Sequence, residues 1–311
     1  MTTAPEISIV IPAYDSHRTL GACLAAIEAQ TFPAFEVVIV DSGPSDEGQR
    51  IVQSRFPRVR FERTPQRLLP HAARNRGVEL AAAQLIVFTD PDIYPKADWL
   101  ACLVEAHQRT KGIVVGAVDC HGRRWLDLGI HLAKFDMWLP GSPAGTASIA
   151  PTLNLLCPRR VFEHLGGFPG DVMIGDTLFS WIAVARGYRI TFEPRAVVDH
   201  HHLSSWGQLL GERLARGAEF GMLRVEQGGW GGARVLVQLA ASILPIRLIR
   251  LMVRTLRHAG RAGVLGVALS TSPVIVTAHA AWLAGESRAF ISFLSGARWR
   301  RGAAENPASD S

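Results

Sequence analysis

The sequence predicts an α/β fold in which an open, mostly parallel β-sheet is flanked by helices. Short apolar segments rich in β-branched residues alternate with segments of helical spacing over the first 120 residues, and a polar or acidic residue follows several of the apolar segments. Continuous hydrophobic strands are typical of parallel sheets that are buried on both faces. Their alternation with helices indicates a Rossmann-like sheet, and ligands of such sheets bind beyond the carboxyl ends of the strands.

The first expected elements are a strand, a helix and a second strand that ends at an acidic residue. Ile7–Ile11 is a continuous β-branched run, as in a buried parallel strand. Leu20–Gln30 combines helical spacing with good helix formers. Glu36–Val40 is a second apolar strand that ends at Asp41, and the segment SGPSD after it has turn chemistry and residues that cap helices.

The same alternation continues through the next part of the chain. Arg58–Glu62 is expected as a short strand and Pro70–Ala82 as an Ala-rich helix. Leu85–Thr89 is an apolar strand that runs into the acidic tripeptide DPD. Ala97–Arg109 has helical spacing, and Ile113–Asp119 is a further apolar strand. This order supports the open sheet with helices on its faces.

The region from about residue 120 to 200 is less regular and rich in Gly and Pro. Leu153–Cys157 is expected as a strand and Thr177–Arg186 as a helix. Two strand-like segments follow, Arg189–Phe192 and Arg195–Val198, and three consecutive histidines come directly after them. A helix is expected over Trp206–Leu223.

Composition limits the class of protein. The chain has 311 residues, of which 48% are hydrophobic and 19% charged, so it is long and apolar enough to bury a large core. A disordered or fibrous protein is excluded. The four cysteines show no CxxC spacing, which disfavours a disulfide scaffold or a zinc ribbon. The N-terminus has no secretory signal pattern, so we expect a location on the cytoplasmic side.

The charge is concentrated at the C-terminal end. From Ala233 to Ser311 there are ten Arg, no Lys and three acidic residues, a net charge of +7, whereas the preceding residues carry 23 basic and 24 acidic groups. Four of these arginines recur at spacings of three, four and three, which places them on one face of a helix within an otherwise hydrophobic segment. They are Arg247, Arg250, Arg254 and Arg257.

This basic, hydrophobic segment predicts an amphipathic helix that lies on an anionic membrane surface. Nucleic acid is not expected as the partner, because a helix that follows phosphates needs no apolar face. Residues 262–285 are long enough to cross a membrane, but they contain the sequence STSP and much Ala and Gly. A membrane-spanning segment there is therefore the second interpretation.

Acidic and histidine residues after the strands are candidates for a metal site. Asp90 and Asp92 would point to the same side of an extended backbone and offer hard oxygen ligands to Mg²⁺ or Mn²⁺. A neutral imidazole from the histidines 200–202 could complete the ligand set. The alternatives are a solvated turn for the two aspartates and an exposed polar turn for the histidines.

Four further positions have a structural and a functional interpretation. Asp176 precedes an apolar helical segment and fits either an N-cap or a catalytic base at the rim of the site. Arg74 is either a solvated helix residue or a partner of a diphosphate. Tyr14 and Asp41 are either strand terminators or a ring and a carboxylate that hold a nucleobase. The absence of G-x-G-x-x-G, Walker A and G-x-S-x-G patterns disfavours dehydrogenases, P-loop NTPases and α/β-hydrolases.

Four blocks of the sequence resemble the family 2 glycosyltransferases, which have the A-type glycosyltransferase (GT-A) fold. The first is ISIVIPAYDSHRTLGACLAAIEAQTFPAFEVVIVDSGPSD, at residues 7–46. The other three are HAARNRGVELAAAQLIVFTDPD at 71–92, NLLCPRRVFEHLGGF at 154–168 and GDTLFSWIAVARGYRI at 175–190. The resemblance covers about residues 6–225 and implies a catalytic domain over residues 1–232, with a nucleotide-binding part to about 120 and an acceptor part after it. The basic, hydrophobic composition predicts a membrane-associating helical tail over 233–311.

The resemblance also implies an activity and a set of site residues. The activity is metal-dependent, inverting transfer of a sugar from a nucleoside diphosphate sugar, a UDP-sugar first, to a hydroxyl group of a glycan, lipid-linked or cell-envelope acceptor. Asp176 would be the general base. The donor would be held by Pro12, Ala13, Tyr14, Asp41, Arg74 and Asp90, and Mg²⁺ or Mn²⁺ by Asp92 with His200 or His202.

The sequence departs from the family pattern at three positions. The family has Glu where this chain has Gly175, Arg where it has Ile182, and Ser where it has Pro44. Loss of the Glu removes a carboxylate near the acceptor. A non-catalytic binding protein with the same fold, and a metal-dependent nucleotidyltransferase or phosphohydrolase, are therefore the alternative functions.

Overall fold

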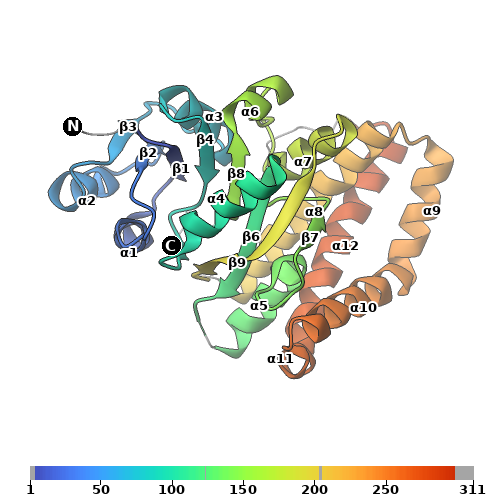
Figure 1. The fold of residues 1–311 in the computed structure, drawn as a ribbon. Coiled ribbons are helices and arrows are strands. Elements are labelled where there is room, and N and C mark those ends of the chain that lie inside the picture. Colours follow the sequence, from blue (N-terminus) through green and yellow to red (C-terminus); the bar gives the residue numbers. More distant parts are fainter. Residues whose placement is uncertain (1–3, 123, 203–204, 298–311) are drawn as a thin grey trace. The chain divides into compact units, whose positions relative to one another are not determined.

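A computed structural model describes residues 4–122, 124–202 and 205–297 and divides them into two compact units (Figure 1). The first unit contains the chain up to His121, Pro143–Asp171 and Gly175–His201. The second contains Gly122–Ser142, Val172–Ile174 and the chain from His202 onward. Both units are therefore built from segments that are distant in the sequence.

The first unit is a mixed sheet with helices on it, as the sequence predicts. Its strand order is β3-β2-β1-β4-β8-β6-β9-β5, and β7 pairs with β9. β1, β2, β3 and β4 are mutually parallel, and β8 is antiparallel to both of its neighbours. The strands are β1 (Ile7–Ala13), β2 (Phe35–Asp41), β3 (Arg60–Arg63), β4 (Leu85–Phe88), β5 (Ile93–Pro95), β6 (Ile113–Cys120), β7 (Gly145–Ala147), β8 (Leu155–Pro158) and β9 (Ile190–His200).

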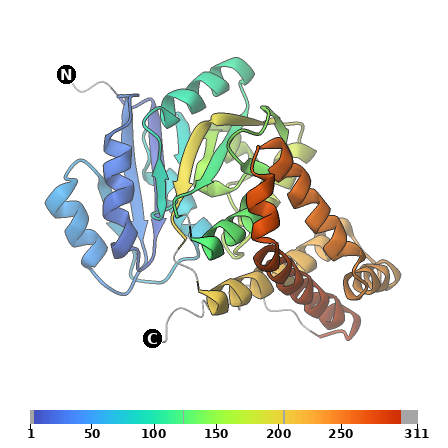
Figure 2. The same ribbon diagram turned by 90° about the horizontal axis from the view of Figure 1, so that it is seen from below.

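The helices of the first unit each bury one side, and on α3 this side includes His71 and Arg74. α1 and α2 lie side by side (Figure 2), whereas α3 packs on β1 and β2. The approach of α3 is close, because a Cβ added at Gly77 would lie 2.3 Å from Val10 Cγ1. The helices are α1 (His17–Glu28), α2 (Glu47–Arg55), α3 (Pro70–Leu80), α4 (Trp99–Thr110), α6 (Arg159–Leu165) and α7 (Gly175–Ala185), with the 3-10 turn η2 (Thr152–Asn154).

Two of the expected strands differ in extent, and β5 and β7 lie where the sequence predicts no strand. β1 continues through Pro12 to Ala13, because its pairing with β4 ends at Val10 and no β4 partner requires an N–H from the proline. The segments expected as two strands after residue 189 form the single strand β9, whose register against β6 shifts between Gly116 and Ala117. A Cβ at Gly116 would lie 2.3 Å from the carbonyl oxygen of Ala196, so this irregular pairing requires glycine.

The second unit is a helical bundle. α8 and α12 pack closely, because a Cβ at Gly285 would lie 2.1 Å from the carbonyl oxygen of Leu214 and one at Gly217 would lie 2.2 Å from that of Trp282. α8 therefore groups with the helices after residue 232, whereas the sequence assigns it to the catalytic part. The helices are α5 (Trp125–Phe135), α8 (Trp206–Gly228), α9 (Gly232–Ile243), α10 (Ile246–Arg261), α11 (Leu265–Ser270) and α12 (Ser272–Leu294), with the 3-10 turn η1 (Asp136–Trp138).

The four arginines of the predicted amphipathic helix do not share one role. Arg247 pairs with the buried carboxylate of Glu286, and Arg254 Nε lies 3.0 Å from Oδ2 of the buried Asp136. Only Arg250 and Arg257 are exposed. The expectation of a four-arginine outer face is wrong, because acidic side chains of the bundle interior bind the two arginines at the flank of the helix.

The C-terminal segment is also broken where the sequence suggests long helices. α9 and α10 meet at Leu244-Pro245 with a bend of 68°, and they are the one described helix pair whose length and composition would allow a membrane crossing. No single helix among the described residues passes that test. The segment at 262–285 forms α11 and the first part of α12, where Val274, Ile275 and Ala278 are fully buried in the bundle core.

Candidate active site

A shallow pocket lies at the carboxyl ends of β1 and β2, where a Rossmann-like sheet places its ligands. The parallel register sets Ala13 beside Asp41, with Pro12 opposite Val40. The structure thus brings together the residues expected around a nucleoside. The pocket is lined by Ala13, Asp15, His17, Leu20, Asp41 and Ser45.

Asp41 is a buried carboxylate that is poorly neutralised. It is 4% exposed, and its Oδ1 accepts the Gly43 N–H at 2.8 Å. Burial raises the pKa of this carboxyl above its ordinary value, although the bond from Gly43 and the charge of Arg63 act in the opposite direction. Tyr14 is exposed, with the guanidinium carbon of Arg67 4.5 Å from the centre of its ring. An acceptor and an aromatic face therefore stand at the same edge of the sheet.

The acidic tripeptide after β4 forms a turn instead of an extended strand. The Ile93 N–H donates to the carbonyl of Asp90 at 3.1 Å, so the two aspartates take different partners. Asp90 Oδ1 accepts a hydrogen bond from the guanidinium of Arg74, which is buried on α3. Asp92 Oδ2 lies 3.8 Å from Nε2 of His200, the last residue of β9.

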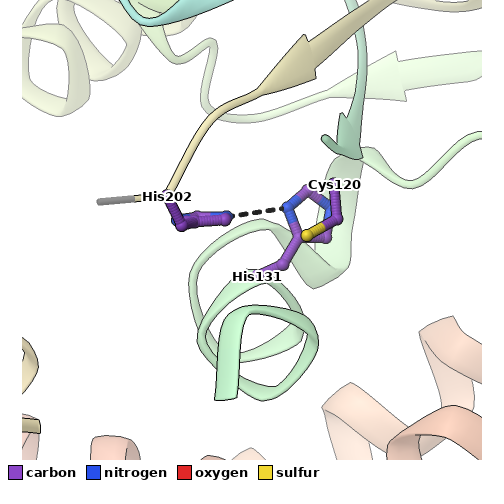
Figure 3. Close-up of side chains that lie close together, drawn as sticks. All are labelled: Cys120, His131 and His202. Atoms are coloured by element: carbon purple, nitrogen blue, oxygen red, sulfur yellow. Dashed lines mark hydrogen bonds between the residues drawn. The ribbon is translucent and has the colours of Figure 1, made fainter. Parts of the chain in front are cut away.

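The three consecutive histidines go to three different environments. His200 faces Asp92, whereas Nδ1 of His201 lies 2.9 Å from the Tyr94 hydroxyl. His202 belongs to the second unit, where its Nε2 lies 3.3 Å from Nδ1 of His131 (Figure 3). His200 is thus the histidine that the first unit itself brings to Asp92. The assignment of His202 as a metal ligand stays a prediction.

Asp176 lies in the first turn of α7, one residue inside the helix, so it is not the N-cap. Its Oδ1 accepts the N–H of Thr177 at 2.7 Å, and its own N–H lies 3.3 Å from Nε2 of His71. A carboxylate at this place is favoured by the positive end of the helix dipole. Its side chain is half-buried, which leaves it accessible to a proton donor.

His71 is a site residue to which the sequence reasoning assigned no role. It is 2% exposed, its Nδ1 lies 3.4 Å from a terminal nitrogen of Arg74, and its ring packs on Phe168. Contacts therefore run without a break from Asp90 through Arg74 and His71 to Asp176. The sequence does place His71 one helical turn before Arg74, on the same face of the helix. Helical spacing alone does not distinguish such a histidine from an ordinary buried residue.

The structure resembles a solved enzyme throughout its length. The mannosyltransferase PcManGT from Pyrobaculum calidifontis, solved in complex with GDP-Man and Mn²⁺, matches with a TM-score of 0.62 and 22% identity, over 93% of this chain and 88% of that chain. The fold is therefore the GT-A fold, and the helices after the sheet belong to the matched region.

Sequence comparisons identify the family. Residues 8–160 match the family model described as glycosyl transferase family 2. The chain is 27% identical over 226 residues to the glycosyltransferase AglE of Haloferax volcanii, covering 70% of this chain and 73% of that protein. It is 23% identical over 228 residues to the pre-mycofactocin glycosyltransferase of Mycobacterium tuberculosis, covering 70% of this chain and 46% of that protein. The chain belongs to the family 2 glycosyltransferases and is a glycosyltransferase enzyme.

Proposed function

We propose that this enzyme transfers a sugar, with inversion and with a divalent metal ion, from a nucleoside diphosphate sugar to a hydroxyl group of a glycan, lipid-linked or cell-envelope acceptor. The observation that carries the proposal is the row of contacts from Asp90 through Arg74 to Asp176, beside the pair of Asp92 and His200. Asp90 on the donor side, Arg74 as the cation for phosphate and Asp176 as the base are thus linked by successive contacts. A UDP-sugar is the first donor to test, and GDP-mannose, which PcManGT binds, is the second.

The pair of Asp92 and His200 fits Mg²⁺ or Mn²⁺. Ligand atoms lie about 2.1 Å from such an ion, so two atoms 3.8 Å apart are close enough to share one. A carboxylate oxygen suits either ion, and an imidazole nitrogen favours Mn²⁺ of the two. When bound, the ion would offset negative charge on the leaving diphosphate.

The protein's own residues account for the rest of the reaction. Asp41 accepts hydrogen bonds from the nucleoside, and the exposed ring of Tyr14 stacks on the base. Arg74, fixed by Asp90, places a positive charge for the diphosphate. Asp176 takes the proton of the acceptor hydroxyl as its oxygen attacks the anomeric carbon from the face opposite the diphosphate. Attack from that side inverts the configuration without a covalent enzyme intermediate.

The test of this function uses a panel of nucleoside diphosphate sugars, with and without Mn²⁺. The cognate donor should raise the melting temperature of the protein in a Mn²⁺-dependent way, since a ligand that binds only the native state stabilises it. Incubation with an acceptor should then release the nucleoside diphosphate. Release of pyrophosphate or inorganic phosphate instead would favour a nucleotidyltransferase or a phosphohydrolase.

We also propose that the second unit rests on the cytoplasmic side of an anionic membrane. The outer face of α10, defined by Ile246, Ile249, Val253, Arg250 and Arg257, is exposed over its whole length. Its apolar side chains recur at the spacing of one helical face, with the two arginines beside them. Large apolar side chains on the segments that precede and follow α10 in the sequence are exposed as well, namely Leu236, Val237, Ile243, Leu244, Leu265 and Leu269.

An anionic bilayer is the occupant that this surface favours. Apolar side chains enter the acyl boundary while arginines stay at the headgroups, and each arginine there contributes about 1 kcal/mol. Full-length protein should float with anionic vesicles and much less with neutral ones, and high salt should weaken its binding. Recovery with neither kind of vesicle would refute the membrane proposal and leave a protein interface on this face. Equal recovery with neutral and anionic vesicles would refute the preference for an anionic surface.

A further inference from the structure

Position 175 has no room for a side chain. A Cβ added at Gly175 would lie 2.7 Å from the carbonyl oxygen of Pro169 and 2.8 Å from Cδ2 of His71, both inside van der Waals contact. The imidazole of His71 therefore fills the space that a residue larger than glycine would enter. Position 175 therefore holds a glycine because the ring of His71 occupies the space that a larger side chain would need.

His71 also supplies a hydrogen-bond acceptor to the first turn of α7, the helix that carries Asp176. The first N–H groups of a helix have no acceptor within it. In α7 the Thr177 N–H is bonded by the side chain of Asp176, and the Asp176 N–H faces Nε2 of His71 at 3.3 Å. An amide N–H can only donate, so Nε2 is the acceptor in this contact. The acceptor thus comes from α3, a helix distant in the sequence.

The opposite edge of the same ring faces the donor side. Its Nδ1 lies 3.4 Å from Arg74, whose guanidinium binds the carboxylate of Asp90. Because Nε2 accepts the Asp176 N–H, the proton of the neutral ring is on Nδ1, so the ring packs against the guanidinium and accepts no hydrogen bond from it. His71 and Arg74 are 2% and 3% exposed, so little water reaches this contact. A single rigid ring therefore lies between the group expected to bind diphosphate and the group expected to accept the proton.

We propose that His71 is a positioning residue of the transfer reaction, which holds the backbone of Asp176 at a fixed place relative to Arg74 and does so in the space left by Gly175. This inference rests on the proposed role of Asp176 as base. His71 itself touches no reacting atom in this account. Its contribution is the fixed separation of base and donor, on which the rate of a two-substrate reaction depends strongly.

Two substitutions separate the acceptor atom from the ring volume. His71→Phe keeps an aromatic ring against Phe168 but has no acceptor for the Asp176 N–H. His71→Gln gives up the ring and can present its Oε1 near the place of Nε2. We expect kcat to fall about 10- to 100-fold in the Phe variant, the scale of one buried donor left without a partner. The donor KM should change less than about 3-fold, because Arg74 keeps Asp90.

The Gln variant should recover most of the lost kcat, and the exposed His164→Asn should leave kcat unchanged. Equal loss in the Phe and Gln variants, or an unchanged kcat in the Phe variant, overturns the proposal. A lower melting temperature with unchanged kcat per folded enzyme overturns it as well, since His71 would then be only structural.

Amide hydrogen exchange at Asp176, followed by NMR without substrate, separates this inference from the proposed function. Exchange should be slow in the wild type, at least tenfold faster in His71→Phe and slow again in His71→Gln. If the wild type transfers no sugar yet shows this pattern, the proposed function fails while the positioning of Asp176 stands. If it transfers sugar and the exchange rates do not differ, the positioning role fails alone.

Discussion

Two buried carboxylates, Asp41 of the first unit and Asp136 of the second, have opposite electrostatic surroundings. Asp41 of the first unit is 4% exposed and accepts one backbone N–H, and burial raises the pKa of its carboxyl. Asp136 of the second unit is 2% exposed. Burial alone would raise its pKa too, but hydrogen bonds and charges from His258 and Arg254 outweigh burial and lower it.

This is the difference we expect between a carboxylate that binds a ligand, as proposed for Asp41, and one that holds helices together. Asp136 on η1 receives Nε and a terminal nitrogen of Arg254, Nδ1 of His258 and the hydroxyl of Thr255, all from α10. Its acceptor capacity is used within the protein. Asp41 retains acceptor capacity at a pocket, although ionising it there is unfavourable. A buried carboxylate whose ionisation disfavours folding, and which lines a pocket, is typical of a ligand-binding site.

The largest expected effect is on the fold of the second unit. Asp136→Asn leaves Arg254 and His258 beside a neutral side chain and should lower the free energy of unfolding by about 3 kcal/mol at pH 7. The surface variant Glu79→Gln, which breaks an exposed pair with Arg76, should cost less than about 0.5 kcal/mol. Urea denaturation of both variants measures the contrast.

The pH dependence of this effect has a definite sign. Because the folded-state pKa of Asp136 is lowered, its contribution to stability is complete above the ordinary carboxyl range near about 3.9 and is lost as the pH falls through the lowered value. The difference between the wild type and Asp136→Asn should therefore shrink in acid. A difference that stays constant from pH 7 to pH 3 would contradict the role of the charge.

The next effect in size concerns the base. Asp176→Asn should reduce kcat about 10²-fold or more, the scale for loss of a positioned proton acceptor, while the donor KM and the melting temperature change little. Steady-state kinetics at saturating acceptor give this measurement. Loss of donor affinity and of stability together with kcat would place Asp176 with the structural carboxylates, alongside Asp136.

A smaller effect is expected on the outer face of α10. Reversing Arg250 and Arg257 to Glu should lower the partition onto anionic vesicles about 30-fold or more, since each arginine contributes about 1 kcal/mol. The exposed pair Arg58 and Arg189 in the first unit, reversed to Glu, is the control with the same change of net charge. Equal losses in both double variants would indicate a general effect of charge rather than this surface.

The smallest expected effect is the change in melting temperature on replacing Asp41. Because the folded-state pKa of Asp41 is raised, ionisation opposes folding, and any stabilising contribution is present below the ordinary carboxyl pKa and lost as the pH rises. Asp41→Asn should therefore raise the melting temperature at pH 7, by about 2 °C, and at the same time raise the donor KM. A lower melting temperature would show that Asp41 is structural like Asp136.

The sequence was sufficient for most of the sheet but not for the bundle. Apolar β-branched runs such as Ile7–Ile11 and Ile113–Asp119 predict buried strands, and the structure has strands there. The roles of Arg247 and Arg254 could not be read from spacing, because their partners Glu286 and Asp136 are distant in the sequence. A helical period shows which residues share a face and gives no information on what that face contacts.

The site shows the same limit at a smaller scale. The positions after β1, β2 and β4 were predictable, because parallel strands bring their carboxyl ends to one edge. The role of His71 was not, since it depends on the space at Gly175 and on the first turn of α7, about 100 residues further along the chain. The turn at Pro91 likewise separates Asp90 from Asp92, against the extended backbone expected there.

Donor binding by the full-length protein shows whether the acids at the sheet edge form a metal-dependent site for a nucleoside diphosphate sugar. Isothermal titration of the cognate donor should show Mn²⁺-dependent binding in the wild type. Asp92→Asn should abolish that dependence while keeping the wild-type circular dichroism spectrum, because this side chain makes little of the core. Equal Mn²⁺-dependent affinity in the wild type and in Asp92→Asn would contradict the account.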